Sequence, residues 1–98
     1  MTLNNILKKY VRNSNFVHRK IGADNILVPI RQINAESESL YTLNDVASFI
    51  WEQLKDPKNI EELLETILIE YEVNKDTARQ DVMELVNNLV ENGILVEE

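Results

Sequence analysis

The stretch from Asn74 to Gly93 constrains the fold most, because it carries the longest helical pattern in the chain. Asn74 is a good N-cap residue, and Gly93 can adopt the left-handed conformation that commonly follows the last turn of a helix. Two lines of side chains at helical spacing run between them: Ala78, Val82, Leu85 and Leu89, and beside them Arg79, Met83, Val86 and Val90. A surface helix needs only one apolar face of about 100°. Either the domain or a partner must therefore cover the second line.

Composition and charge limit the class of protein. The 98 residues are 44% hydrophobic and 28% charged, as expected for a single globular domain. The sequence has no cysteine, which excludes disulfides, iron–sulfur clusters and thiolate zinc sites. A net charge of −7 disfavours a nucleic-acid surface. No apolar run approaches the ~18 residues of a membrane span. We expect a soluble cytoplasmic protein without a cofactor, metal or membrane contact.

Residues 1–15 are predicted to form an amphipathic extension to a domain that spans residues 16–98. The apolar side chains Leu3, Ile6, Leu7, Tyr10 and Val11 recur there at helical spacing, and three basic side chains lie on the opposite side. Thr2 is the predicted cap of this helix. A helix of about ten residues is marginal alone, so we expect docking or a mobile tail in preference to membrane binding. One docking place is the second apolar line, which residues 3–12 would cover when no partner is bound.

Three strands are predicted between Phe16 and Leu43. The sequences FVHRK (16–20) and SLYTL (39–43) flank the continuous apolar run ILVPI (26–30), which we expect to be buried on both faces. Turn residues at 22–25 and a polar segment at 34–38 connect the strands. Such short connections predict an antiparallel meander.

Three helices are predicted after the strands. Asn44 caps the first, which ends before Asp56-Pro57. Asn59 followed by Glu62 predicts a capping box at the start of the second. The third is the helix after Asn74, and the residues beyond Gly93 predict a short apolar tail that can add to the sheet. The fold class is α+β with winged-helix character and an extra N-terminal amphipathic helix.

The chain offers few side chains for catalysis. His18 is the only histidine, and its place in an alternating strand predicts a solvent-facing residue or a turn cap. The carboxylates at 61, 62, 65 and 72 fall on predicted outer helix faces, where solvated charge is the ordinary interpretation. The two glycines lie too far apart for a phosphate-binding loop. We predict that the protein is not an enzyme.

A DNA-binding helix–turn–helix is the alternative function. The second and third helices, joined by a short turn, would make the third a recognition helix with Lys75 and Arg79 near its start. Asp76, Asp81 and Glu84 on the same helix would repel phosphates. A winged-helix DNA-binding module, or another small interaction module, is kept as the second hypothesis.

Four segments together resemble the PqqD family, the coenzyme PQQ synthesis protein D-like domains that are also described as precursor-peptide recognition elements. They are VHRKIGADNILVPI, LYTLNDVASFIWEQL, IEELLETILIEY and DVMELVNNLVENGILV, and the resemblance runs from about Phe16 to Val96. Its most specific pieces are Leu43-Asn44-x-x-Ala47 with Ile50-Trp51, and Asp81-Val82 followed by Leu89 and Gly93-Ile94-Leu95. The chain departs from the family in its N-terminal extension and at Asp56-Pro57, where relatives often carry a glycine turn.

The resemblance implies a three-stranded sheet packed on three helices and a non-catalytic peptide-binding adaptor. Such domains bind the leader of a ribosomally made precursor peptide and present it to a modifying enzyme, such as a radical SAM protein, a peptidase or a cyclase. The leader adds to the edge of the third strand and lies against the third helix. Carried onto this sequence, the edge is Ser39, Leu40, Tyr41 and Thr42, and the helix wall is Arg79, Met83, Val86 and Val90. Asp81 is expected to have a structural hydrogen-bond or ion-pair role.

Strand edges and apolar helix surfaces suit this role on physical grounds. An unpaired edge is a template for backbone pairing, and neighbouring side-chain pockets add specificity. Met83 suits such a wall because its unbranched side chain adapts to different partners. If the second line is the wall, Val86→Asp is expected to abolish peptide binding and to cost the free protein little stability.

Overall fold

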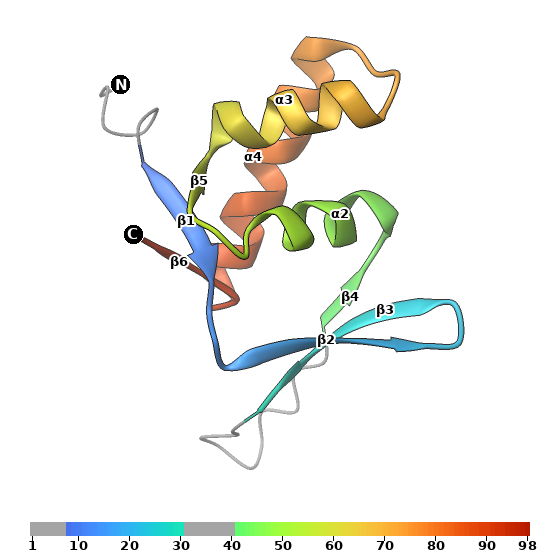
Figure 1. The fold of residues 1–98 in the computed structure, drawn as a ribbon, viewed down its shortest axis with the longest axis vertical. Coiled ribbons are helices and arrows are strands. Elements are labelled where there is room, and N and C mark those ends of the chain that lie inside the picture. The colour runs from blue at the N-terminus through green and yellow to red at the C-terminus, as the bar shows by residue number, and fades with distance from the viewer. Residues whose placement is uncertain (1–7, 31–40) are drawn as a thin grey trace.

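The computed structural model describes residues 8–30 and 41–98 (Figure 1). In chain order the elements are β1 (Lys9–Arg12), β2 (Phe16–Ile21), β3 (Asp24–Pro29), β4 (Tyr41–Leu43), α2 (Asp45–Gln53), β5 (Lys58–Asn59), α3 (Ile60–Glu70), α4 (Lys75–Glu91) and β6 (Leu95–Glu97). The strands form two antiparallel sheets, which we name sheet A (β5-β1-β6) and sheet B (β2-β3-β4). Figure 1 shows the three helices together at one end of the molecule and sheet B at the other, with β4 leading directly into α2.

Sheet B is the predicted meander. β2 and β3 form a hairpin whose turn uses Gly22 at a φ of 61°, and β4 pairs with β3 so that Tyr41 lies opposite Leu27. Leu27 is fully buried, whereas its neighbours Ile26 and Val28 are only half-buried. Successive side chains of a strand point to opposite faces, so only one face of β3 packs against the core. The expectation that the apolar run is buried on both faces is therefore wrong.

The N-terminal segment is a strand where a helix was expected. Residues 9–12 form β1, the middle strand of sheet A, with Tyr10 buried between β5 and β6. A middle strand pairs its backbone on both edges, whereas a helix of about ten residues is marginal alone. The predicted helix is wrong for these residues, and Thr2 and the rest of residues 1–7 lie outside the described residues. The predicted boundary at residue 15 would separate β1 from β5 and β6, the strands with which it pairs. The C-terminal tail forms β6 beside β1 and does not join sheet B.

The predicted helix termini are confirmed. Asn44 accepts a hydrogen bond from the Ala47 N–H at 2.8 Å, and Asn59 and Glu62 form the reciprocal capping box at the start of α3. Asn74 caps α4. At the other end of α4, Gly93 at a φ of 74° donates to Val90 and Ile94 donates to Leu89. These two bonds form a Schellman motif, which satisfies the last carbonyls of the helix.

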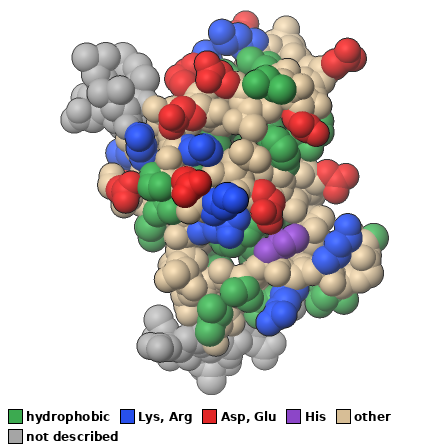
Figure 2. Space-filling model, in the orientation of Figure 1, with side chains coloured by type: hydrophobic (Ala, Val, Ile, Leu, Met, Phe, Trp, Pro, Cys, Tyr) green, Lys and Arg blue, Asp and Glu red, His purple; other side chains and the backbone are tan. Residues whose placement is uncertain are grey.

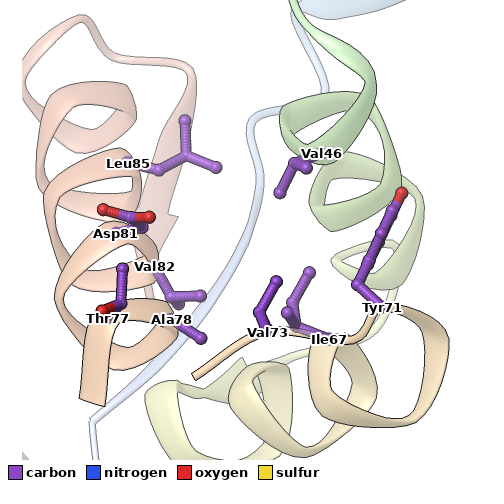
Figure 3. Close-up of a pocket in the computed structure, with 9 residues that line it drawn as sticks. All are labelled: Val46, Ile67, Tyr71, Val73, Thr77, Ala78, Asp81, Val82 and Leu85. Carbon is purple, nitrogen blue, oxygen red and sulfur yellow. The ribbon is translucent and has the colours of Figure 1, made fainter. Parts of the chain in front are cut away.

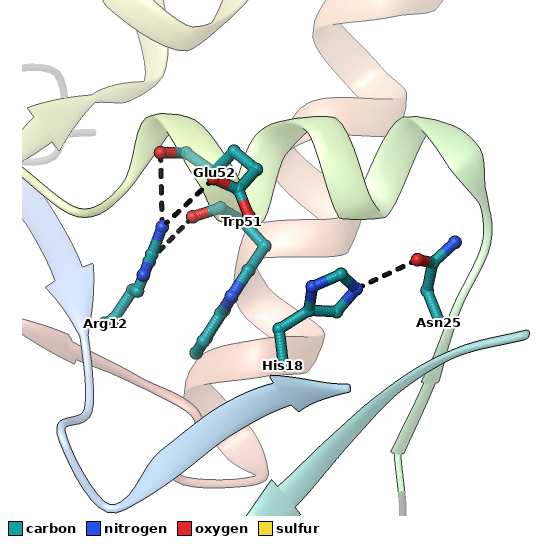
Figure 4. Close-up of polar contacts among 5 residues, drawn as sticks. All are labelled: Arg12, His18, Asn25, Trp51 and Glu52. Atoms are coloured by element: carbon teal, nitrogen blue, oxygen red, sulfur yellow. Dashed lines mark hydrogen bonds and ion pairs between the residues drawn. The ribbon is translucent and has the colours of Figure 1, made fainter. Parts of the chain in front are cut away.

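The core lies between the helices and the inner faces of both sheets. Its fully buried side chains include Leu27, Ile50, Trp51, Leu54, Leu63, Leu64, Val86, Leu89, Ile94 and Leu95. Arg12 joins β1 to the end of α2: its Nε donates to the Trp51 carbonyl at 2.9 Å, and its guanidinium lies 4.8 Å from the Trp51 ring (Figure 4). α2 has no basic residue in its last turn, so Arg12 supplies the cation that the carbonyl end of a helix favours.

His18 has a partner on the neighbouring strand. Its Nε2 lies 2.9 Å from Oδ1 of the buried Asn25, and the contact is partly buried (Figure 4). His18 therefore satisfies a core amide of the hairpin. It is neither the solvent-facing residue nor the turn cap that the sequence predicted.

Candidate functional site

The predicted strand edge is present in part. Tyr41 and Thr42 belong to β4, whereas Ser39 and Leu40 lie outside the described residues. Within residues 8–30 and 41–98, β4 pairs only with β3, so its second edge carries no strand. The Tyr41 hydroxyl donates to Asn88 Oδ1 of α4 at 3.3 Å. β4 is thus an available edge that lies beside α4.

The predicted helix wall is not assembled beside that edge. Arg79 forms an ion pair with Glu61 of α3. Met83 borders a recess of about 240 Å³ on the side of sheet A, which is lined by Lys8, Tyr10, Ile60, Met83, Asn87 and Glu97. At 3.6 residues per turn, Met83 points about 160° away from Leu85. Arg79 and Met83 therefore lie on the flank of α4 that faces α3 and sheet A, and the half-buried Val90 packs against the core.

Val86 does not lie on the surface, as the predicted helix wall requires. Its side chain is 0% exposed, so it is part of the core and offers no surface to a peptide. The side chains that α4 buries are Ala78, Val82, Val86 and Leu89. Leu85, predicted as a core residue, is only half-buried. Ala78, Val82 and Leu89 are buried as predicted, whereas the neighbouring residues Leu85 and Val86 have exchanged their predicted roles.

An apolar pocket of about 130 Å³ lies between α2, the end of α3 and the first half of α4 (Figure 3). It is lined by Val46, Ile67, Tyr71, Val73, Thr77, Ala78, Asp81, Val82 and Leu85. Val46 is 39% exposed and Val73 is 48% exposed, so the rim of the pocket presents two valines to solvent. The pocket is thus an open apolar surface at which three helical segments meet.

Sequence reasoning missed this pocket. The available signal was Val73 itself, a single apolar residue between Glu72 and Asn74. Its significance depends on Val46 and Leu85, which are distant in sequence, so the signal is weak without the fold.

The pocket continues along α4 toward β4. Thr77, Asp81, Leu85 and Asn88 follow one another at helical spacing on the same flank, and Asn88 meets Tyr41 of β4. Opposite them, the chain runs from β4 into the first turn of α2, where Val46 lies. Seven residues of helix separate Asp81 from Asn88, which is about 10 Å. An extended peptide covers that distance in about three residues. We name this strip, Tyr41, Thr42, Val46, Asp81, Leu85 and Asn88, the β4–α4 surface.

Charge is unevenly divided along the chain. Residues 8–30 contain five basic and one acidic residue, whereas residues 41–98 contain four basic and fourteen acidic ones. In Figure 2 acidic side chains lie mainly over the helical end, where basic side chains are also present, and further basic side chains lie near the hairpin. On α4, Arg79 is engaged by Glu61, while Asp76, Asp81, Glu84 and Glu91 are exposed. This helix surface disfavours DNA phosphates.

Residues 8–30 and 41–98 contain no group of three or more His, Asp or Glu side chains that could hold a metal ion. In the same ranges, no helix has both the length and the apolar character needed to cross a membrane.

Comparison with known proteins gives a family and a fold. The family described as Coenzyme PQQ synthesis protein D (PqqD) matches residues 33–95. The solved structure "TbiB1 in Complex with the TbiA(beta) Leader Peptide" is 24% identical and superposes with a TM-score of 0.69, over 87% of this chain and 93% of that chain. "Lasso peptide synthetase B1 complexed with the leader peptide" is also 24% identical, with a TM-score of 0.70 over 89% and 96%. Curated protein sequences give no match.

Proposed function

The chain belongs to the coenzyme PQQ synthesis protein D (PqqD) family, and from this premise we propose that it is a non-catalytic adaptor for a precursor peptide. It binds the leader of a ribosomally made peptide and presents that peptide to a modifying enzyme. Support comes from the two structures of the same fold, both of which are complexes with leader peptides. The observation on this chain that carries the proposal is the edge of β4 that pairs with no strand within residues 8–30 and 41–98, next to an open apolar pocket.

The strand edge supplies the sequence-independent part of binding. A leader segment in extended conformation pairs its backbone with the free edge of β4, beginning beside Tyr41 and Thr42. Such strand addition draws its affinity from main-chain hydrogen bonds, which nearly every sequence can make. The short length of β4 limits the number of these bonds, so side-chain contacts must provide the rest.

The pocket supplies the sequence-dependent part. An engineered protein cavity of about 150 Å³ holds a benzene molecule, so a pocket of about 130 Å³ has room for one apolar side chain of the leader. Burial of such a side chain is worth about 1.5–3 kcal/mol. The walls are Val46 on α2 and Leu85 on α4. They take the place of Met83 and Val86 in the predicted site.

The partner that receives the leader is a modifying enzyme, with a radical SAM protein, a peptidase or a cyclase as the predicted classes. An adaptor of this kind needs two separate surfaces, because the leader and the enzyme are bound together. The β4–α4 surface occupies one flank of α4, and the half-buried pair Val17 and Val28 lies outside it on sheet B. The choice among the three enzyme classes is a prediction from the family.

The test is a titration of the ¹⁵N-labelled protein with synthetic leader segments of short peptides encoded beside its gene. Saturable changes in amide chemical shift are expected at residues 41–43, at Val46 and along residues 81–88. Changes confined to β1, β6 and the Met83 flank would overturn the proposed location. The absence of a saturable change with every neighbouring peptide would overturn the proposed function.

A further inference from the structure

Among the described residues that line the apolar pocket, Asp81 is the only charged one. It lies on α4, one helical turn from Thr77 and one turn from Leu85, and in Figure 3 Leu85 points from α4 toward α2 beside it. The remaining lining consists of aliphatic side chains, Tyr71 and Thr77. A single carboxylate therefore borders a surface that otherwise favours apolar groups.

This carboxylate has no partner among the described residues. The ion pairs in residues 8–30 and 41–98 are Lys8–Glu97, Arg12–Glu52 and Arg79–Glu61. Arg79, the nearest arginine along α4, is thus engaged on the opposite flank. The structural hydrogen-bond or ion-pair role expected for Asp81 is absent from this part of the chain. Water solvates its carboxylate in the free protein.

Occupation of the pocket changes the surroundings of Asp81. When an apolar side chain of the leader fills the pocket, it removes water from the carboxylate beside it. An ionised group that loses water without gaining a partner opposes binding. Two other acidic residues adjoin the exposed valines of the rim, Asp45 before Val46 and Glu72 before Val73. The local potential is therefore negative, and it favours a cation.

We propose that Asp81 makes this pocket selective for leaders that carry a lysine or arginine close to their apolar anchor residue. The proposal rests on the proposed function and names the class of leader. Side chains on one face of a strand repeat every second residue, at about 6.6 Å. Asp81 and Leu85 are one helical turn apart, about 5.4 Å along the axis. The cation accordingly occupies the second position from the anchor, on the side away from the segment paired with β4.

The test is a display selection with a library of random dodecapeptides, carried out in parallel on the wild type and on four variants. Asp81→Asn removes the charge, Asp81→Lys reverses it, and Val46→Asp blocks the pocket. Glu91→Gln is the matched control, because it removes the same charge from an exposed position at the far end of α4. Thermal melts establish that each variant is folded.

The wild type and Glu91→Gln are expected to enrich lysine or arginine at the second position from an apolar anchor. Asp81→Asn loses this preference, and Asp81→Lys enriches aspartate or glutamate at the same position. For one selected basic peptide, fluorescence anisotropy should give a Kd about three- to tenfold weaker with Asp81→Asn than with the wild type. That difference should shrink as the salt concentration rises.

Different outcomes of this selection would overturn the role of Asp81 and the proposed function. If the wild type enriches peptides that Val46→Asp does not bind, but without a preference for basic residues, the assignment of Asp81 is overturned and the proposed function stands. The same holds if Asp81→Lys selects the same peptides as the wild type. If no peptide is enriched over Val46→Asp, the pocket binds no leader, and both proposals are overturned.

Discussion

The two flanks of α4 differ in whether their charged and apolar groups have partners within the described residues. On the flank toward α3 and sheet A, charged groups are already paired, Arg79 with Glu61 and Lys8 with Glu97. On the flank toward β4 and α2, an open strand edge, an apolar pocket and the carboxylate of Asp81 are without partners among the described residues. The recess on the first flank is the larger of the two. We therefore expect groups without partners, and not the larger volume, to mark the flank that receives a peptide.

The core face between the two flanks provides the largest expected effect. Val86→Asp places a carboxylate at a position with no exposure, which should cost several kcal/mol and is comparable with the whole stability of a small domain. We expect loss of the cooperative thermal transition. Met83→Asp, three residues earlier and 46% exposed, is the matched control and should change stability by about 0.5 kcal/mol or less. Similar melting of the two variants would show that the assigned core face of α4 is wrong.

Some of this arrangement was predictable from the sequence, because it depends on local chemistry. Asn44, Asn74 and Gly93 act on backbone groups within one helical turn, so the helix boundaries follow from neighbouring residues. The α+β class and the three-stranded meander follow in the same way from periodicity and from turn residues.

The predictions that are wrong concern features that depend on contacts between residues distant in the sequence. β1 is a strand because residues 9–12 pair with β5 and β6, which lie far away in the sequence. Its short apolar pattern fits a helix and a strand equally well. Leu85 and Val86 are both apolar and adjacent, and only the packing of α4 against the rest of the domain decides which is buried. The pocket combines Val46, Val73 and Leu85 from three segments, which no local pattern joins.

Leu85→Ala and Val90→Ala compare the two flanks of α4 in peptide binding at similar cost in stability. Both side chains are half-buried and packed on the core, so each truncation should cost about 1–2 kcal/mol of stability. Only Leu85 lines the pocket. We expect Leu85→Ala to weaken a pocket-binding peptide about tenfold and Val90→Ala to leave its Kd unchanged, as measured by fluorescence anisotropy. Equal losses for the two variants would mean that the flanks do not differ in binding.

Arg79→Ala should have the smallest effect. The variant breaks the ion pair with Glu61, whose side chains are both partly exposed, and such pairs contribute about 0.2–1 kcal/mol. Chemical denaturation should detect a loss in this range, while peptide affinity stays within about twofold of the wild type. A large loss of affinity would place Arg79 in the binding surface, as the sequence first indicated.

The central claim is that a leader peptide docks on the pocket flank of α4, and one titration tests it most directly. A peptide selected on the wild type is measured against Val46→Asp and against Ile69→Asp, which adds the same charge at an aliphatic position that is 86% exposed and outside the pocket. Both variants should fold, and Asp at position 46 lies in the first turn of α2, where negative charge is favourable. We predict at least a tenfold loss of affinity for Val46→Asp and no change for Ile69→Asp. Equal affinity of the peptide for the two variants would contradict the account.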